Sequence, residues 1–156
     1  MSQEVTAPQT PQIRRPRQKR SQERFERILD VAEELLEELE PGNISIYTLA
    51  EKADMSPPSI YHFFPDSQHV FGALAERYFQ KFSHDLDPVP VDLRQSWQDL
   101  IEFRFAATRR FYNEHIAARK VILGSGSSWS IRTRDFELVE ELARAEIGRA
   151  SCRERV

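Results

Sequence analysis

SIYTLAEKADMSPPSIYHFFP, residues 45–65, contains two short apolar patterns separated by a turn. The first pattern predicts a helix from Ser45 to Ala53, because Ser45 is a favourable N-cap residue. Its apolar residues recur at helical spacing and are expected to point inward: Ile46, Leu49, Ala50 and Ala53. Asp54 and Met55 then form the turn.

The second pattern begins with two adjacent prolines. Ser56 can cap this helix with its hydroxyl, which leaves Pro57 and Pro58 at the first two helical positions. Backbone amides have no intrahelical acceptor there, so prolines cost little at a helix start. Ile60 and either Phe63 or Phe64 are expected to pack inward, and Pro65 marks the end.

Two short helices joined by a tight turn are typical of a helix-turn-helix unit. In that unit the second helix lies in the major groove and the first crosses the DNA backbone. The residues expected to face outward are small, hydroxylated or aromatic, which suits phosphate oxygens and base edges: Pro58, Ser59, Tyr61 and His62. The pattern alone also fits a three-helix bundle with no DNA-binding role.

Further helices are expected on both sides of this unit. Ser21 offers an N-cap for the preceding helix, with Arg24 at the position where Glu would complete a capping box, and Pro41-Gly42 stops it. Its acidic face is interpreted as solvated. The later apolar patterns predict helices from Asp66 or Ser67 to about His84, Leu93 to Tyr112, His115 to Leu123 and Ile131 to Ala145. The fold class is therefore all-α.

Composition narrows the function. The chain has 156 residues, 40% of them hydrophobic, with a formal net charge of -3 and one cysteine, which excludes an internal disulfide. No apolar run is long enough for a membrane span and no signal peptide opens the chain, so we expect a cytoplasmic protein without a membrane partner. The four histidines lack metal-ligand spacing, Cys152 has no partner and no phosphate loop is present. We therefore expect no enzyme, no metal and no cofactor.

Charge is unevenly distributed. Residues 1–20 are predicted to be a disordered arm, in which five residues are basic: Arg14, Arg15, Arg17, Lys19 and Arg20. This arm is either a solubilising tail or a segment that enters the minor groove. Residues 21–66 carry three basic and eleven acidic residues. For DNA binding, the acidic face of the first helix must point away from the duplex.

The span from about Arg20 to Phe82 resembles the DNA-binding domain of the TetR family of transcriptional regulators. The resemblance is carried by ERFERILDVAEELLEEL and by the spacing of Ser45, Leu49-Ala50, Met55-Ser56 and Ile60-Tyr61-x-Phe63-Phe64-Pro65. It implies an all-helical repressor that binds a palindromic operator as a homodimer and is released by a small-molecule effector. It places operator contacts, by position, on Ser45, Tyr47, Pro57, Pro58, Ser59, Tyr61 and His62.

This sequence departs from the family at three points. Asp54 stands where the family usually has glycine, although aspartate tolerates a left-handed turn better than most residues. Ser67 replaces a usual lysine, which removes one phosphate contact. The ending EIGRASCRERV, residues 146–156, breaks the apolar pattern and is interpreted as a non-native tail.

The expected organisation follows from these observations. Residues 1–20 are the basic arm, 21–66 the helix-turn-helix domain, 67–84 a connecting helix and 85–145 an incomplete helical domain for effector binding and dimerisation. The aromatic residues after His84 form either an effector pocket or an ordinary helical core. Four charged residues either select an anionic or polar effector or are ordinary surface: Arg104, Arg109, Arg132 and Asp135. The alternative function is a helical interaction module or a degenerate regulator that no longer binds DNA.

Overall fold

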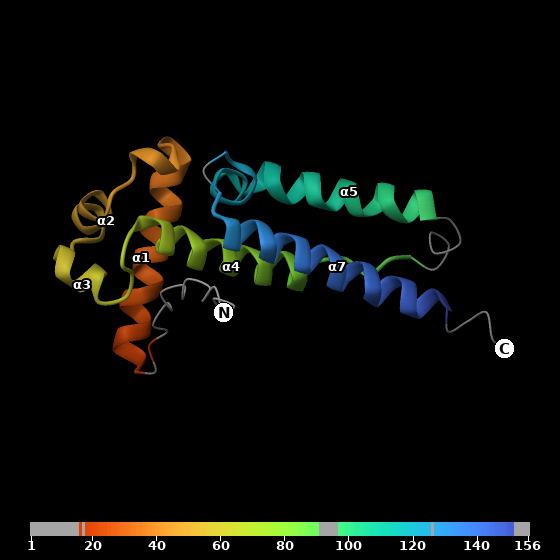
Figure 1. The fold of residues 1–156 in the computed structure, drawn as a ribbon, viewed down its shortest axis with the longest axis horizontal. Coiled ribbons are helices and arrows are strands. Elements are labelled where there is room, and N and C mark those ends of the chain that lie inside the picture. The colour runs from red at the N-terminus through yellow and green to blue at the C-terminus, as the bar shows by residue number, and fades with distance from the viewer. Residues whose placement is uncertain (1–15, 17, 91–96, 126, 152–156) are drawn as a thin grey trace, which may run out of the picture.

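The computed structural model describes residues 16, 18–90, 97–125 and 127–151, and within these ranges the chain is helical with no strand. The helices in chain order are α1 (Lys19–Glu38), η1 (Pro41–Asn43), α2 (Ile46–Ala53), α3 (Pro57–Tyr61), α4 (Ser67–Asp85), α5 (Trp97–Glu114), α6 (Ile116–Ala118), the π-turn η3 (Arg119–Leu123) and α7 (Trp129–Ser151). Figure 1 shows α2 and α3 beside α1 at one end, with α4, α5 and α7 extending away from them.

The helix-turn-helix end is built on a continuous apolar core. Residues from α1, α2, α3, the following turn and α4 are fully buried in it, including Ile28, Leu36, Leu49, Ile60, Phe64, Val70 and Phe71. The rings of Phe25 and Phe64 lie 4.9 Å apart and tie α1 to the end of the α3 segment. Burial of each such side chain contributes roughly 1.5–3 kcal/mol. Short helices such as α2 and α3 depend on this packing, because isolated helices of this length are unstable in water.

The start of α1 differs from the prediction. The helix begins at Lys19 with Gln18 as the N-cap residue, so Ser21 lies inside it. The backbone amides of Ser21 and Gln22 both donate to the carbonyl of Gln18, at 3.0 and 2.9 Å. Lysine and arginine are good helix formers, so no residue in this stretch stops the helix at Ser21.

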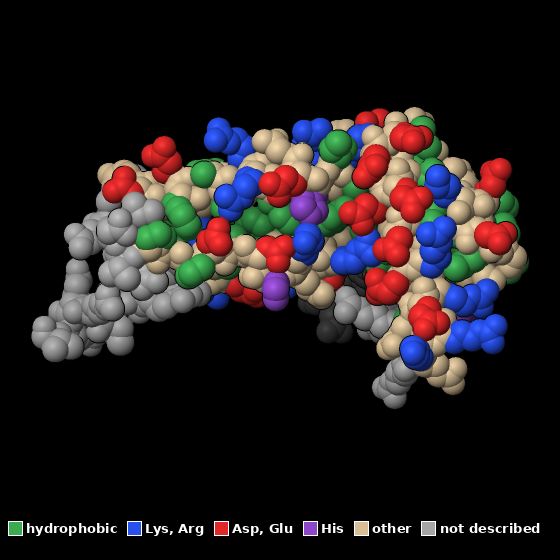
Figure 2. Space-filling view, turned by 180° about the vertical axis from the view of Figure 1, so that it is seen from behind, with side chains coloured by type: hydrophobic (Ala, Val, Ile, Leu, Met, Phe, Trp, Pro, Cys, Tyr) green, Lys and Arg blue, Asp and Glu red, His purple; other side chains and the backbone are tan. Residues whose placement is uncertain are grey.

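The interpretation of the acidic face of α1 as solvated is wrong in part. Arg77 of α4 lies 2.7 Å from Asp30, 2.5 Å from Glu33 and 3.5 Å from Glu26, and the Tyr78 hydroxyl donates to Glu33 at 2.5 Å. We call these five residues the α1–α4 clamp. Acidic side chains gather over α1 in Figure 2, with basic side chains among them.

Burial would lower the pKa of Arg77, but its bond to Asp30 and the charges of the carboxylates outweigh burial and raise it. Arginine is therefore held charged in a half-buried position. Burial and the bond to Glu33 raise the pKa of Tyr78, so its hydroxyl stays protonated as the donor. The clamp thus fixes the position of α4 on α1.

The remaining helices are arranged differently from the sequence expectation in several places. Within the described residues α5 begins at Trp97, while Leu93 lies outside them. Ile101 and Phe105 are apolar residues at helical spacing but are 44% and 70% exposed, because α5 packs mainly through its C-terminal half, around the buried Phe111. The helix α7 extends from Trp129 to Ser151, six residues beyond the predicted end at Ala145.

The predicted helix from His115 to Leu123 is split into α6 and a π-turn. Within that turn the Lys120 ammonium donates to the carbonyl of Leu39 at 3.0 Å and pairs with Glu40 at 3.2 Å. A cation at the C-terminal end of α1 complements the helix dipole. In the part of the chain that the structure describes, no helix has the length and apolar character that crossing a membrane requires.

Candidate nucleic-acid interface

The turn between α2 and α3 is formed by a left-handed residue. Asp54 has φ 54° and ψ 47°, as the sequence predicted. Its amide donates to the carbonyl of Glu51 at 3.3 Å, and the amide of Met55 donates to the carbonyl of Ala50 at 3.0 Å. These two bonds make a Schellman motif, which satisfies the last carbonyls of α2 and turns the chain toward α3.

The start of α2 is confirmed. The Ser45 hydroxyl accepts a hydrogen bond from the amide of Thr48 at 3.1 Å and lies 2.9 Å from the Thr48 hydroxyl. The four apolar residues predicted to point inward are all buried. Tyr47 faces the opposite way and is 67% exposed, so α2 presents a tyrosine and its capped N-terminus to solvent.

The start of α3 is confirmed, but the expected side-chain cap is wrong. Ser56 is the N-cap residue, and Pro57 and Pro58 occupy the first helical positions. The Ser56 hydroxyl makes no cap hydrogen bond and lies instead 2.9 Å from the hydroxyl of Ser59. The serine at i+3 offers this alternative, Pro58 lacks the amide that a cap could bind at the second helical position, and the amide of Ser59 donates instead to the carbonyl of Ser56 at 2.9 Å.

The outward face of α3 has the composition that the sequence predicted. Pro58, Tyr61 and His62 are exposed and Ser59 is half-buried, while Ile60 and both Phe63 and Phe64 are buried. Tyr61 is 48% exposed. Among the described residues the hydroxyls of Tyr47 and Tyr61 have no hydrogen-bond partner, so both can donate to a ligand in solvent.

Arg24 lies beside the candidate interface, and sequence reasoning missed it. It is exposed on α1, and its guanidinium donates to the Ser59 hydroxyl at 3.4 Å. A positive charge therefore lies directly beside α3. The signal was present as a basic residue where a capping-box acid was expected, but only the packing of α1 against α3 shows its partner.

The acidic charge of the domain is partly neutralised by ion pairs. Glu26, Asp30 and Glu33 pair with Arg77 of α4, as described above. Glu34 pairs loosely with Arg27 and Lys52, at 3.8 and 3.7 Å. Carboxylates that are paired with cations repel DNA less than free carboxylates do. The excess of acidic over basic residues in this domain therefore overstates its repulsion of DNA. The basic residues Arg14, Arg15 and Arg17 lie outside the described residues.

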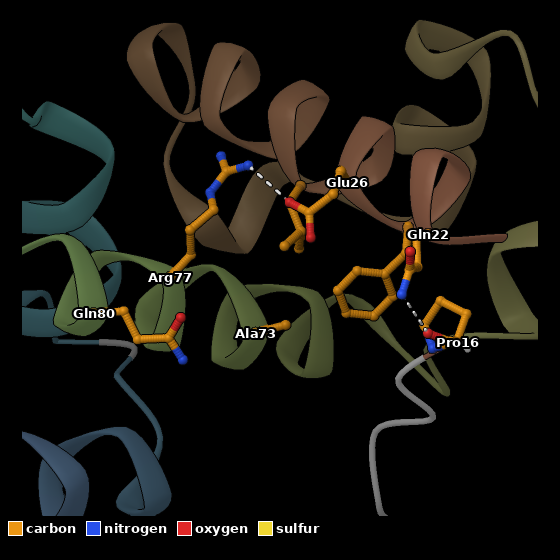
Figure 3. A pocket seen from close by; sticks show the side chains of 8 residues that line it. Pro16, Gln22, Glu26, Ala73, Arg77 and Gln80 are labelled. Carbon is orange, nitrogen blue, oxygen red and sulfur yellow. Dashed lines mark hydrogen bonds and ion pairs between the residues drawn. The ribbon is translucent and has the colours of Figure 1, made fainter. Parts of the chain in front are cut away.

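Two of the hollows away from α3 are relevant here. The first is a groove of about 380 Å³ between α1 and α4, shown in Figure 3, where the Gln22 side chain donates to the carbonyl of Pro16 at 3.2 Å and Arg77 reaches across to Glu26. The second is a cavity of about 210 Å³ among α4, α5, η3 and α7, lined largely by aromatic and aliphatic side chains. Within the described part of the chain, no group of three or more His, Cys, Asp or Glu residues is placed to hold a metal ion.

Comparison with known proteins agrees with this geometry. Residues 28–74 match the model of bacterial regulatory proteins, tetR family, N-terminal domain. This range covers α2, α3, the turn between them and most of α1, together with the first part of α4.

The chain is also similar to a protein of Xanthobacter autotrophicus named "uncharacterized HTH-type transcriptional regulator in dhlA 5′ region". The two are 41% identical over 56 residues, which is 36% of this chain and 28% of the relative. The chain thus matches little more than a quarter of that relative's length. The family match, the turn geometry and the exposed α3 agree: residues 28–74 form an N-terminal helix-turn-helix domain of the TetR type, and the family with this domain consists of DNA-binding transcriptional regulators and not of enzymes.

Proposed function

We propose that this regulator is a repressor that binds a palindromic operator as a homodimer and is released by a small-molecule effector. The observation that carries the proposal is the exposed face of α3, on which polar and aromatic side chains follow the left-handed turn at the end of α2. A palindromic operator offers two half-sites, and a two-fold symmetric dimer matches them. The DNA partner implies a cytoplasmic location.

The proposed contacts divide by chemistry. Tyr47 and Tyr61 donate to phosphate oxygens, since their hydroxyls are exposed and make no bond with described residues. Ser59 and His62 approach base edges in the major groove, and the short side chains of Pro57 and Pro58 allow α3 to approach the DNA closely. Ser45 lies with the capped N-terminus of α2 against the backbone.

The arm has a separate proposed role. Arg14, Arg15 and Arg17 precede α1 and enter the adjacent minor groove, where arginine is favoured electrostatically. They supply attraction that an acidic folded domain lacks. This role predicts that deletion of residues 1–17 weakens binding and lowers its salt dependence, because each phosphate contact contributes about 0.9 to the slope of log K against log salt.

Release is proposed to act through α4. This helix lines the aromatic cavity with Tyr78 and Phe82, and it holds α1 with Arg77 and Tyr78. A ligand in the cavity that moves α4 therefore also moves α1, on which α2 packs and which Arg24 joins to Ser59 of α3. In this division residues 21–66 bind DNA, 67–84 connect and 85–145 hold the effector.

The test uses hydroxyl deletions on α3. Tyr61→Phe and Ser59→Ala should each weaken operator binding about fivefold, since one hydrogen bond contributes roughly 1 kcal/mol. Ser83→Ala is the matched control, because Ser83 is exposed near the far end of α4. Circular dichroism melts should coincide for all variants. If both α3 variants bind DNA as the parent does, α3 is not the reading helix.

A second function is favoured by the charge of residues 21–66, where acidic residues outnumber basic ones by eleven to three. An acidic helical domain with an exposed aromatic face suits a protein partner. In that case the chain is an interaction module or a degenerate regulator, and no DNA sequence is bound in preference to another at physiological salt.

A further inference from the structure

The cavity among α4, α5, η3 and α7 has walls of unusual uniformity. Five aromatic side chains line it, together with aliphatic groups such as Ile122 and Leu138: Tyr78, Phe79, Phe82, Phe111 and Tyr112. Its volume of about 210 Å³ lies below the range of roughly 300–1,000 Å³ that is typical of sites for drug-sized ligands. The cavity therefore suits a compact ligand.

Three of the cavity's rings lie at steep angles to the ring of Phe111, whereas the His115 imidazole stacks on Phe111 at 4.5 Å and 15°. Phe111 lies 5.0 Å from Phe82, 5.6 Å from Tyr112 and 6.3 Å from Tyr78, with interplanar angles of 67°, 78° and 85°. Because aromatic rings carry negative charge on their faces, a wall of rings in several planes offers attractive positions for a cation.

Asp135 is the one charged residue among the described residues that line the cavity. Its side chain is half-buried, and it forms no hydrogen bond or ion pair with any described residue. The neighbouring Arg134 is held elsewhere, by Glu76 at 3.5 Å and by Glu137 and Glu141 at 3.6 Å. Arg104 and Arg110 both bind Asp87.

Burial raises the pKa of the Asp135 carboxyl, and burial together with the charge of Asp135 raises the pKa of Tyr112. A carboxylate that is partly desolvated and lacks a counter-charge is costly in an aromatic cavity. An anionic ligand would increase the free-energy cost of this carboxylate, and a neutral ligand would leave that cost unchanged. A cation removes it.

We propose that the cavity binds a compact organic monocation whose positive nitrogen pairs with Asp135 and whose apolar body lies against the rings of Phe111 and Tyr112. This inference rests on the proposed function, since it names the chemical class of the effector. The sequence left two alternatives for the charged residues of this region, selection of an anionic or polar effector or ordinary surface, and a cationic effector differs from both.

The test compares two probes of nearly the same shape, phenyltrimethylammonium and tert-butylbenzene, which differ mainly in charge. Isothermal titration calorimetry of the full chain should show the cation binding at least about tenfold more tightly than the neutral probe. Asp135→Asn keeps the side-chain shape and should remove that preference. Glu102→Gln is the matched control, because Glu102 is an exposed acid on α5 outside the cavity.

Two results would overturn the inference: equal affinity of the parent and Asp135→Asn for phenyltrimethylammonium, or no binding of this cation at millimolar concentration. The proposed function is tested separately by adding the cation to the protein–operator complex. Cation binding that depends on Asp135 but leaves the complex intact supports the site and contradicts the effector role. Failure to bind any operator contradicts the repressor role, whatever the calorimetry gives.

Discussion

Asp54 offers a sharp test of how the helix-turn-helix is built. It is the one non-glycine residue with positive φ in the described part of the chain, at φ 54° and ψ 47°. A left-handed conformation costs an ordinary L-residue roughly 1–2 kcal/mol, and aspartate somewhat less. A β-branched side chain tolerates it least.

The structure predicts the sign and size of the change in the free energy of unfolding for two substitutions of Asp54. Asp54→Val should lower the free energy of unfolding by about 1–2 kcal/mol, because the Schellman bonds to Glu51 and Ala50 require the left-handed turn. Asp54→Gly removes the steric cost, but glycine loses about 0.5–1 kcal/mol more backbone entropy on folding. The two terms nearly cancel, so Asp54→Gly should stay within about 0.5 kcal/mol of the parent.

Urea unfolding followed by circular dichroism measures both values. Glu51→Gln, on the exposed face of α2 and with its backbone unchanged, controls for the loss of an acidic side chain. If valine is tolerated as well as glycine, the left-handed turn is not what holds α2 against α3, and the account of this motif is wrong.

Three further predictions follow from other parts of the chain. Ser67→Lys places a cation at the start of α4 and should tighten operator binding. The slope of log K against log salt should become steeper by about 0.9, which fluorescence anisotropy at several salt concentrations measures. An unchanged slope would show that this position does not contact phosphate. Arg77→Met keeps the apolar stem but removes the guanidinium from Asp30 and Glu33. The free energy of unfolding, measured in urea, should therefore fall by about 1–2 kcal/mol. An unchanged free energy of unfolding would mean that solvent screens the charges of the α1–α4 clamp completely. Asp135→Asn should raise Tm at pH 7, because the folded state holds the pKa of the Asp135 carboxyl above its ordinary value of 3.8 and so disfavours the ionised form. This gain in Tm should vanish as the pH falls through the raised pKa. A gain in Tm that persists at acid pH would contradict this reasoning.

The parts of the fold set by local rules were predictable from the sequence. The bounds of α2 and its four buried residues follow from capping and periodicity over fewer than a dozen residues, whereas the left-handed Asp54 was expected from the family resemblance. The start of α3 followed from the same rules. The absence of a side-chain cap at Ser56 was not predictable in this way. The Ser56 hydroxyl could bond either to a backbone amide or to a second hydroxyl, and the side chain of Ser59 decides between them.

Contacts between distant segments were not predictable. Arg77 lies 44 residues from Glu33 along the chain, and no periodicity in α1 indicates that its acidic face meets α4. Val31 is buried although it lies off the apolar stripe, because α1 is covered by α2 on one side and by α4 and α6 elsewhere. Conversely, Ile101 and Phe105 keep helical spacing but remain exposed, since spacing identifies a face and not the element that covers it.

The central claim is that α3 reads DNA. Fluorescence anisotropy should be measured for this chain with labelled DNA from immediately upstream of its own gene, at two salt concentrations and with scrambled DNA as competitor. The account predicts binding that prefers the upstream sequence, weakens with salt and is reduced about fivefold by Tyr61→Phe. Equal binding to the scrambled DNA, with no effect of Tyr61→Phe, would contradict it.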